Sequence, residues 1–274
     1  MIDAGVRVHP CRAGPCAAQA LANEASGSVV AAHARAVNLL LDDGSLVAVL
    51  PAGSPIHPWA LATAFESSLV PEGAAVRVAG KVLAAGPLRI DLEGLVIADL
   101  HFRRRPLQVP RDAVTHLAEF ADRLAGDDPF DRKLKAALRS FSDSGDPREL
   151  ALLVGLGTGL TPSGDDVLVG ALAGLDLLLE CSQVAPLLRR TLVEALPVPL
   201  EARTTRLSAQ MLRAAADGLY AEPVLGLLNA LASDNASPGA VERAAAELSR
   251  LGHRSGRDTL LGIAAALSRA IPVP

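Results

Sequence analysis

The residues best suited to chemistry gather at a glycine-rich turn, which reads Gly155-Leu156-Gly157-Thr158-Gly159-Leu160-Thr161-Pro162-Ser163-Gly164-Asp165-Asp166. Thr161 can cap a helix with proline in its first position, and Ser163 with Asp166 forms a competing capping box. Either start leaves backbone N–H groups free at the positive end of a helix dipole, where glycines let a ligand approach. The turn therefore predicts a phosphate or carboxylate site, although it lacks the lysine of a P-loop. The alternative is a capped turn between helices that binds nothing.

A second copy of this pattern follows 92 residues later. Ser163-Gly-Asp-Asp-Val-Leu-Val-Gly170 is similar to Ser255-Gly256-Arg-Asp258-Thr-Leu-Leu-Gly262. A glycine two turns into a helix costs about 1 kcal/mol relative to alanine unless something packs against it. We therefore expect two helices that cross at these glycines and bring their N-termini together into one anion pocket. Chance similarity between two capped, alanine- and leucine-rich helices is the alternative.

A third polar cluster opens a helix after Pro199. It contains one arginine and three hydroxyl side chains, namely Arg203, Thr204, Thr205 and Ser208. Hydroxyl groups and an arginine at a helix start can bind a carboxylate or an amide, so these residues are candidate substrate ligands. The alternative is a threonine cap beside exposed arginines.

Asp165, Asp166 and His253 are candidate catalytic groups, and Asp258 is a candidate substrate ligand. Asp165 and Asp166, together with Asp258, could cap helices, hold Mg²⁺ or accept hydrogen bonds from substrate amide groups. His253 precedes the second helix start and could act as a general acid or base, or stabilise an oxyanion, although a lone histidine is more often structural. The other histidines are interpreted as lining an N-terminal cleft (His33, His57) or as incidental (His9, His101, His116).

Composition excludes several classes of protein. Of 274 residues, 50% are hydrophobic and 3% aromatic, and the formal net charge is −4. That balance does not suggest nucleic-acid binding, and we interpret Arg103-Arg104-Arg105 as a solvated strand exit. The three cysteines, Cys11, Cys16 and Cys181, form no disulfide framework, and a Cys11–Cys16 zinc pair would lack its second half.

The apolar segments predict neither export nor membrane insertion. The first residues do not resemble a signal peptide. The most apolar stretch, residues 167–179, predicts a buried helix because it is too short and too interrupted to span a bilayer. We expect a cytoplasmic protein with no membrane contact and no cofactor.

Sequence periodicity predicts an α+β protein of two domains. Residues 1–110 form a β-rich, barrel- or sandwich-like domain, with a hairpin at 38–50, further strands at 28–36, 74–82, 88–92 and 95–102, and a short helix at 59–69. Residues 111–274 form a helical domain that carries the glycine-rich motifs. Its helices are expected at 111–125, 130–142, 147–154, 162–180, 184–196, 202–217, 221–232, 238–251 and 255–270.

Three motifs together resemble the AllH family, which is named for a subunit of oxamate carbamoyltransferase in anaerobic allantoin degradation. They are Gly155–Asp166, Thr204-Thr205-x-x-Ser208 and Gly252-His253-x-Ser255-Gly256-x-Asp258, and the resemblance covers mainly residues 145–270. Thr158 and Arg254 depart from the expected proline and small residue, and Arg254 could alter substrate choice.

The resemblance implies carbamoyl transfer between carbamoyl phosphate and oxamate, with oxalurate as the carbamoylated product. It implies an FdrA-like partner subunit, and a homo-oligomer is a further possibility. In this reading His253 and backbone N–H groups stabilise charge on the carbamoyl oxygen, and Asp165 or Asp166 orients or deprotonates the amide. Two alternatives stay open: a non-catalytic assembly or regulatory subunit, and a Mg²⁺-dependent phosphotransfer enzyme using Asp165, Asp166 and Asp258.

Overall fold

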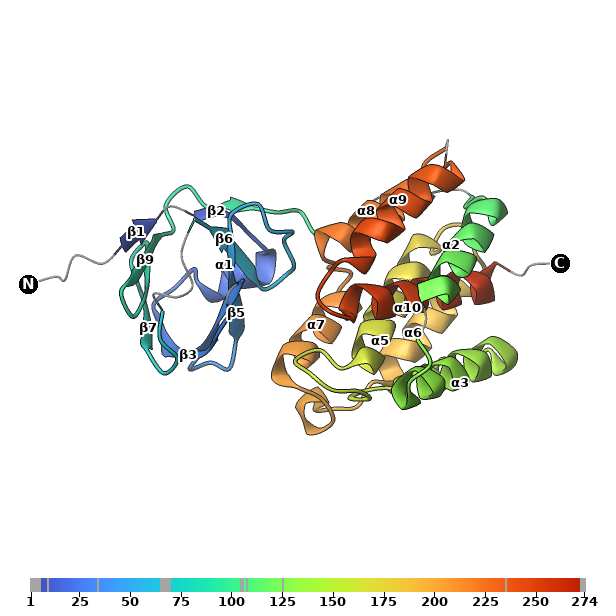
Figure 1. The fold of residues 1–274 in the computed structure, drawn as a ribbon, viewed down its shortest axis with the longest axis horizontal. Coiled ribbons are helices and arrows are strands. Elements are labelled where there is room, and N and C mark those ends of the chain that lie inside the picture. Colours follow the sequence, from blue (N-terminus) through green and yellow to red (C-terminus); the bar gives the residue numbers. More distant parts are fainter. Residues whose placement is uncertain are drawn as a thin grey trace, which may run out of the picture. The chain divides into compact units, whose positions relative to one another are not determined.

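A computed structural model describes residues 6–8, 10–33, 35–64, 70–103, 106, 108–124, 126–234 and 236–271. The chain forms two compact units, Met1–Leu100 and His101–Pro274 (Figure 1). The first is built from strands and the second from helices, which confirms the predicted α+β class. Within the described residues, no helix is long and apolar enough to cross a membrane.

The N-terminal unit is a curled mixed sheet with one short helix. Its strand order is β1-β9-β8-β7-β3-β4-β5-β6-β2-β10, with parallel pairs β1–β9, β5–β6 and β2–β10. The elements are β1 (Val6–Val8), β2 (Pro10–Ala13), α1 (Pro15–Ala20), β3 (Ala25–His33), β4 (Ala36–Leu41), β5 (Leu46–Pro51), β6 (Ala60–Thr63), β7 (Ala75–Ala79), β8 (Val82–Ala85), β9 (Leu88–Asp91) and β10 (Val96–Ile97).

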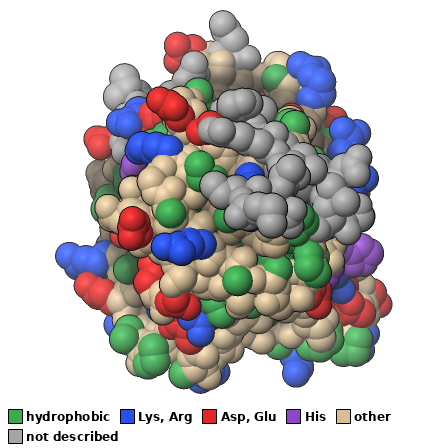
Figure 2. Space-filling view, turned by 90° about the vertical axis from the view of Figure 1, so that its left-hand side faces the viewer, with side chains coloured by type: hydrophobic (Ala, Val, Ile, Leu, Met, Phe, Trp, Pro, Cys, Tyr) green, Lys and Arg blue, Asp and Glu red, His purple; other side chains and the backbone are tan. Residues whose placement is uncertain are grey.

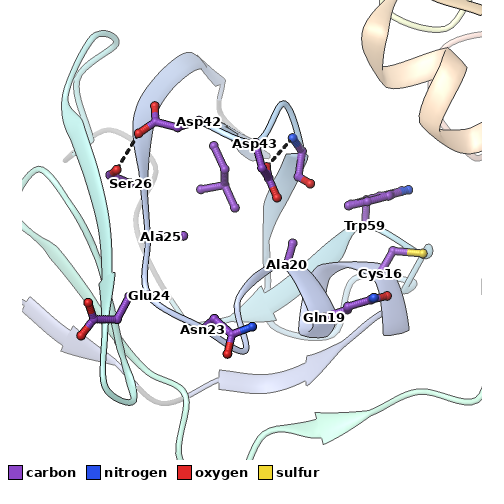
Figure 3. A pocket seen from close by; sticks show the side chains of 12 residues that line it. Cys16, Gln19, Ala20, Asn23, Glu24, Ala25, Ser26, Asp42, Asp43 and Trp59 are labelled. Atoms are coloured by element: carbon purple, nitrogen blue, oxygen red, sulfur yellow. Dashed lines mark hydrogen bonds between the residues drawn. The ribbon is translucent and has the colours of Figure 1, made fainter. Parts of the chain in front are cut away.

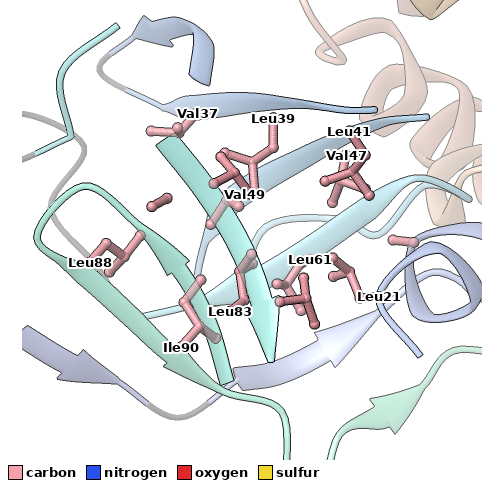
Figure 4. Packing of buried hydrophobic residues seen from close by; sticks show 14 of the residues in the cluster. Leu21, Val37, Leu39, Leu41, Val47, Val49, Leu61, Leu83, Leu88 and Ile90 are labelled. Carbon is pink, nitrogen blue, oxygen red and sulfur yellow. The ribbon is translucent and has the colours of Figure 1, made fainter. Parts of the chain in front are cut away.

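The inner face of this sheet holds an aliphatic core. Alternate residues of the strands point inward, among them Val37, Leu39, Val49, Leu83 and Ile90, all of which are fully buried (Figure 4). Leucine and valine fill the space because the chain has few aromatic residues. On the face of this unit drawn in Figure 2, acidic and basic side chains are interspersed.

The β4–β5 hairpin predicted at 38–50 is confirmed. Val37 pairs with Val49 and Leu40 with Leu46, and Gly44 occupies the turn with a φ of 89°. The helix predicted at 59–69 is wrong where it is described, because residues 60–63 form β6, while residues 65–69 lie outside the described part. Both faces of β6 are buried, and such a short apolar run has no periodicity that separates a strand from a helix.

All nine helices predicted in the C-terminal half are present among the described residues. They are α2 (Arg111–Leu124), α3 (Pro129–Ser144), α4 (Arg148–Ala151), α5 (Ser163–Leu177), α6 (Ala185–Ala195), α7 (Arg206–Ala216), α8 (Glu222–Leu231), α9 (Pro238–Ser249) and α10 (Ser255–Ala270). Helix α5 is buried on almost every side, as the apolar stretch predicted.

Helices α5 and α10 cross with their backbones in contact (Figure 1). A Cβ atom on Gly170 would lie 1.9 Å from the carbonyl oxygen of Thr259, and one on Gly262 would lie 1.9 Å from that of Val167. Any side chain at either position would therefore push the helices apart. The prediction that two helices cross at the repeated glycines is confirmed.

Candidate functional site

The starts of α5 and α10 meet, as the repeat predicted. The hydroxyl oxygens of Thr161 and Ser255 lie 2.7 Å apart and form a hydrogen bond. Both side chains are half-buried, so the junction reaches the surface. Gly170 and Gly262 lie two turns further along their helices. The close crossing there fixes the positions of the two helix axes, and therefore the point at which the helix starts meet.

The glycines that follow the two serines have their backbone N–H groups hydrogen-bonded within the chain. The N–H of Gly164 donates to the Leu156 carbonyl (2.8 Å), and that of Gly256 donates to the Leu251 carbonyl (2.9 Å). The N–H groups of these two glycines, both predicted substrate ligands, are therefore already used within the chain. The predicted caps are also wrong, because Pro162 and Arg254 occupy the N-cap positions and neither makes a side-chain cap hydrogen bond.

Free N–H groups do occur in the loop immediately before α5. No acceptor within the described chain meets the N–H groups of Thr158, Gly159 and Leu160, and all three residues are exposed. Gly159 has a φ of 95°, and no atom lies within 4 Å of its Cβ position. Gly157 packs closely against the next turn, since a Cβ there would lie 2.7 Å from the Ser163 nitrogen. The glycine-rich loop thus presents backbone donors beside Thr161.

Asp166 lies beneath the Thr161–Ser255 junction. The residue is 9% exposed, and its Oδ2 atom is buried without a hydrogen-bond partner in the described chain. Burial, reinforced by the neighbouring carboxyl groups of Asp258 and Asp165, raises the pKa of Asp166 to about 8, although the Ser255 and Thr161 hydroxyls oppose the change. Asp166 is therefore largely protonated at neutral pH.

Asp165 faces the other way and is fully hydrogen-bonded within the chain. Its Oδ1 accepts the N–H of Gly155 (2.8 Å), and its Oδ2 accepts the hydroxyls of Thr204 and Ser208, the latter at 2.7 Å. The two hydroxyls thus bind a carboxylate, as their types suggested, but it is that of Asp165. With both oxygens occupied and 1% exposure, Asp165 holds the loop, α5 and α7 together.

The rest of the Arg203–Ser208 cluster also supports the loop. Thr205 caps α7 by accepting the N–H of Ser208 (3.1 Å), and its hydroxyl donates to the carbonyl of Leu160 (2.5 Å). The Arg203 carbonyl lies where a Cβ of Gly155 would stand, while the Arg203 side chain is exposed. The alternative interpretation, a threonine cap beside an exposed arginine, describes this segment.

A charge network that the sequence analysis missed surrounds Asp258, which is completely buried. Arg257 donates to Asp258 Oδ1 (Nε at 3.0 Å) and to Asp131 (2.6 Å), and Arg254 binds both Asp128 and Asp131. Asp128 and Asp131 form the capping box of α3. The Asp-Pro-x-Asp pattern at 128–131 could have revealed this cap. Arg254 thus ties α3 to the start of α10.

His253 is exposed in the turn before α10, next to Gly252, whose Cβ position is 3.3 Å from the Ser255 hydroxyl. His57 is half-buried, and desolvation lowers its pKa to about 4, while its Nδ1 accepts the N–H of Trp59. It therefore supports a turn rather than lining an open cleft. The predictions on His9, Arg104, Arg105 and the Cys11 side chain concern atoms outside the described part.

The described residues include no group of three or more His, Cys, Asp or Glu side chains placed to hold a metal ion. Asp165 binds hydroxyls of α7, so the three aspartates of the Mg²⁺ alternative do not form one donor set.

A separate pocket of about 580 Å³ lies in the N-terminal unit, between α1 and the β4–β5 turn (Figure 3). Its lining includes Trp59 and Cys16.

The fold and the site define a two-unit α+β protein with a repeated helix-start motif in its helical unit. One family model, described as oxamate carbamoyltransferase subunit AllH, matches residues 153–267, and another, described as the AllH family N-terminal domain, matches residues 11–98. The chain therefore belongs to the AllH family, and is a carbamoyltransferase-related subunit. No solved structure matches it significantly.

Proposed function

We propose that this chain is a cytoplasmic carbamoyltransferase subunit that binds a small anion of the carbamoyl phosphate, oxamate or oxalurate class where α5 and α10 begin. Membership of the AllH family supports the reaction class. One observation carries the location: the buried, unpartnered Oδ2 of Asp166 beneath the Thr161 and Ser255 hydroxyls. Buried polar atoms are rarely left unpaired, so a ligand group is the natural partner.

The electrostatics of this junction are compatible with an anion. Because the pKa of Asp166 is raised to about 8, its carboxyl group is mostly neutral at pH 7 and can donate a hydrogen bond to an oxyanion. The free N–H groups of residues 158–160 and the two hydroxyls add donors, and the dipoles of two helices add partial positive charge. A charged Asp166 would instead repel the ligand.

In the proposed reaction, the amide nitrogen of oxamate forms a bond to the carbamoyl carbon while the bond from that carbon to the phosphate oxygen breaks. The nitrogen loses a proton and phosphate leaves. We assign Asp166 and the loop N–H groups to binding and charge stabilisation, and His253 to proton transfer from its exposed turn. Asp165 acts as a positioning residue, because its oxygens are already occupied. We also propose that an FdrA-like partner completes the enzyme.

Thermal denaturation tests the binding site. Carbamoyl phosphate, oxamate and inorganic phosphate, each at millimolar concentration, should raise the Tm of the wild-type chain, alone or with its partner. Ser255→Ala should remove the part of the shift that comes from binding at this junction. Ser182→Ala is the matched control, because its hydroxyl donates to the Ala270 carbonyl at the other end of α10 (3.0 Å). A shift that keeps its full wild-type size in both Ser255→Ala and Thr161→Val would place the ligand elsewhere.

The saturated contacts of Asp165 and the close packing at Gly164 favour a second candidate, a non-catalytic assembly subunit. In that case the repeated motifs serve helix packing, and the substrates bind on a partner. The two candidates differ in one measurement: an assembly subunit shows no anion-dependent change in Tm, either alone or with an FdrA-like partner.

A further inference from the structure

The helical unit has a pocket of about 600 Å³ near the end of α5, three turns away from Asp166. Its lining combines charged groups with two apolar side chains and a glycine: His101, Phe102, Arg103, Asp176, Leu179, Arg189, Asp217 and Gly218. None of these residues belongs to the Thr161–Ser255 junction. His101, interpreted from sequence as incidental, is thus part of a pocket wall.

One arginine in this wall is held in a fixed orientation. Arg189 of α6 binds both oxygens of Asp176, and its Nη2 also donates to the Ala216 carbonyl (2.8 Å). The hydroxyl of the buried Tyr220 donates to Asp176 Oδ2 (2.6 Å). Both oxygens of Asp176 are therefore occupied, and the carboxylate has little capacity left for a ligand.

The guanidinium group keeps unused donors. The Nη1 atom of Arg189 has no hydrogen-bond partner among the described residues, and the side chain is 22% exposed. Two N–H bonds of a rigidly held, charged group are therefore left for a ligand, which lowers the entropy cost of binding.

The negative end of α7 does not cancel this positive charge. The carbonyls of residues 213–216 all accept hydrogen bonds, from backbone N–H groups, the Tyr220 hydroxyl or Arg189. Asp217 at the rim is exposed, so solvent weakens its repulsion of an anion without removing it. The Asp176 oxygens are already hydrogen-bonded, so the Arg189 Nη1 donor is the main group left to bind a ligand in the pocket.

We propose that this pocket is a second oxyanion site, in which Arg189 Nη1 binds the oxygen atoms of a small carboxylate or phosphate. Arg103 adds a second guanidinium group to the wall, and Phe102 and Leu179 provide apolar surface for the rest of the ligand. The site is independent of the one proposed at the α5 and α10 starts, so either can fail without the other.

Calorimetric titration of the full chain carrying Ser255→Ala, with inorganic phosphate and separately with acetate, tests this site free of the first one. Arg189→Gln should weaken binding about tenfold or more, which is the size of a lost charged hydrogen bond. Asp217→Asn removes an opposing exposed charge and should tighten binding roughly two- to fivefold. Arg190→Gln is the matched control, because this neighbouring arginine is 69% exposed and, among the described residues, pairs only with Glu194.

Stronger binding of phosphate than of acetate, or the reverse, identifies the preferred ligand and supports the site in either case. The proposal is overturned if neither anion binds at millimolar concentration, or if Arg190→Gln weakens binding as much as Arg189→Gln. Arg189→Gln leaves Asp176 without its charged partner, so this variant has a risk of not folding. Asp217→Asn then decides, and unchanged or weaker binding in that variant rejects the proposal.

Discussion

The crossing of α5 and α10 gives the sharpest test of the structure. In Gly262→Ala, the new Cβ would lie 1.9 Å from the Val167 carbonyl oxygen and 2.8 Å from the Ala171 nitrogen, whereas ordinary contact begins at 3.4 Å. Both neighbours are backbone atoms, so the helices themselves must separate. We expect overpacking to cost about 3 kcal/mol, the upper end of the usual range. The better helix propensity of alanine returns about 1 kcal/mol, for a net loss of about 2 kcal/mol.

Gly226→Ala is the matched control for this substitution. Gly226 lies in α8, is exposed, and has no atom within 4 Å of its Cβ position. The same change should therefore stabilise the protein by about 1 kcal/mol through helix propensity alone. Urea unfolding followed by far-UV circular dichroism measures both free energies. If Gly262→Ala were as stable as Gly226→Ala, the close crossing would be wrong.

Three further predictions concern buried polar groups. The raised pKa of Asp166 makes the folded state bind more protons than the unfolded state between about pH 4 and pH 8, so stability should fall as pH rises through that window. Asp166→Asn should flatten the dependence, and an unchanged slope would contradict the raised pKa. Ser208→Ala leaves Asp165 short of one donor and should cost about 2 kcal/mol in urea unfolding, whereas no loss would show that this bond contributes nothing. Tyr220→Phe removes the hydroxyl that binds Asp176 and should lower the free energy of unfolding by about 1.5 kcal/mol, and a neutral effect would refute that contact.

The helical unit could be predicted from sequence because its local signals agree. Alanine and leucine at helical spacing mark each helix, and glycine or proline marks most of its ends. The sheet could be predicted only in part. Residues 60–63 are buried on both faces, so they lack the alternation that identifies a strand, and their alanine and leucine favour helix. Pairing with β2 and β5, which depends on distant residues, overrides that preference.

The meeting of the two serine turns could be predicted because glycine is costly inside a helix. Gly170 and Gly262 were therefore expected to pack against another element, and each packs against the backbone of the helix that carries the other. The roles of the aspartates could not be predicted in the same way. Asp165 and Asp166 are adjacent, so their side chains point in different directions from a helix. Which of them has both oxygens hydrogen-bonded and which keeps an oxygen without a partner among the described residues depends on where α7 packs.

The repeat extends beyond the residues that match in sequence. In the first copy the Leu153 carbonyl lies where a Cβ of Gly164 would stand, and in the second copy the Leu248 carbonyl takes the same place against Gly256. The first copy has three more residues between these contacts than the second. Those extra residues fall in the glycine-rich loop, where the N–H groups of residues 158–160 meet no acceptor among the described residues. We therefore expect shortening of this loop to keep the crossing of α5 and α10 while removing anion binding. Unfolding free energy and ligand-induced Tm shift, measured on one such variant, separate the packing role of the repeat from its binding role.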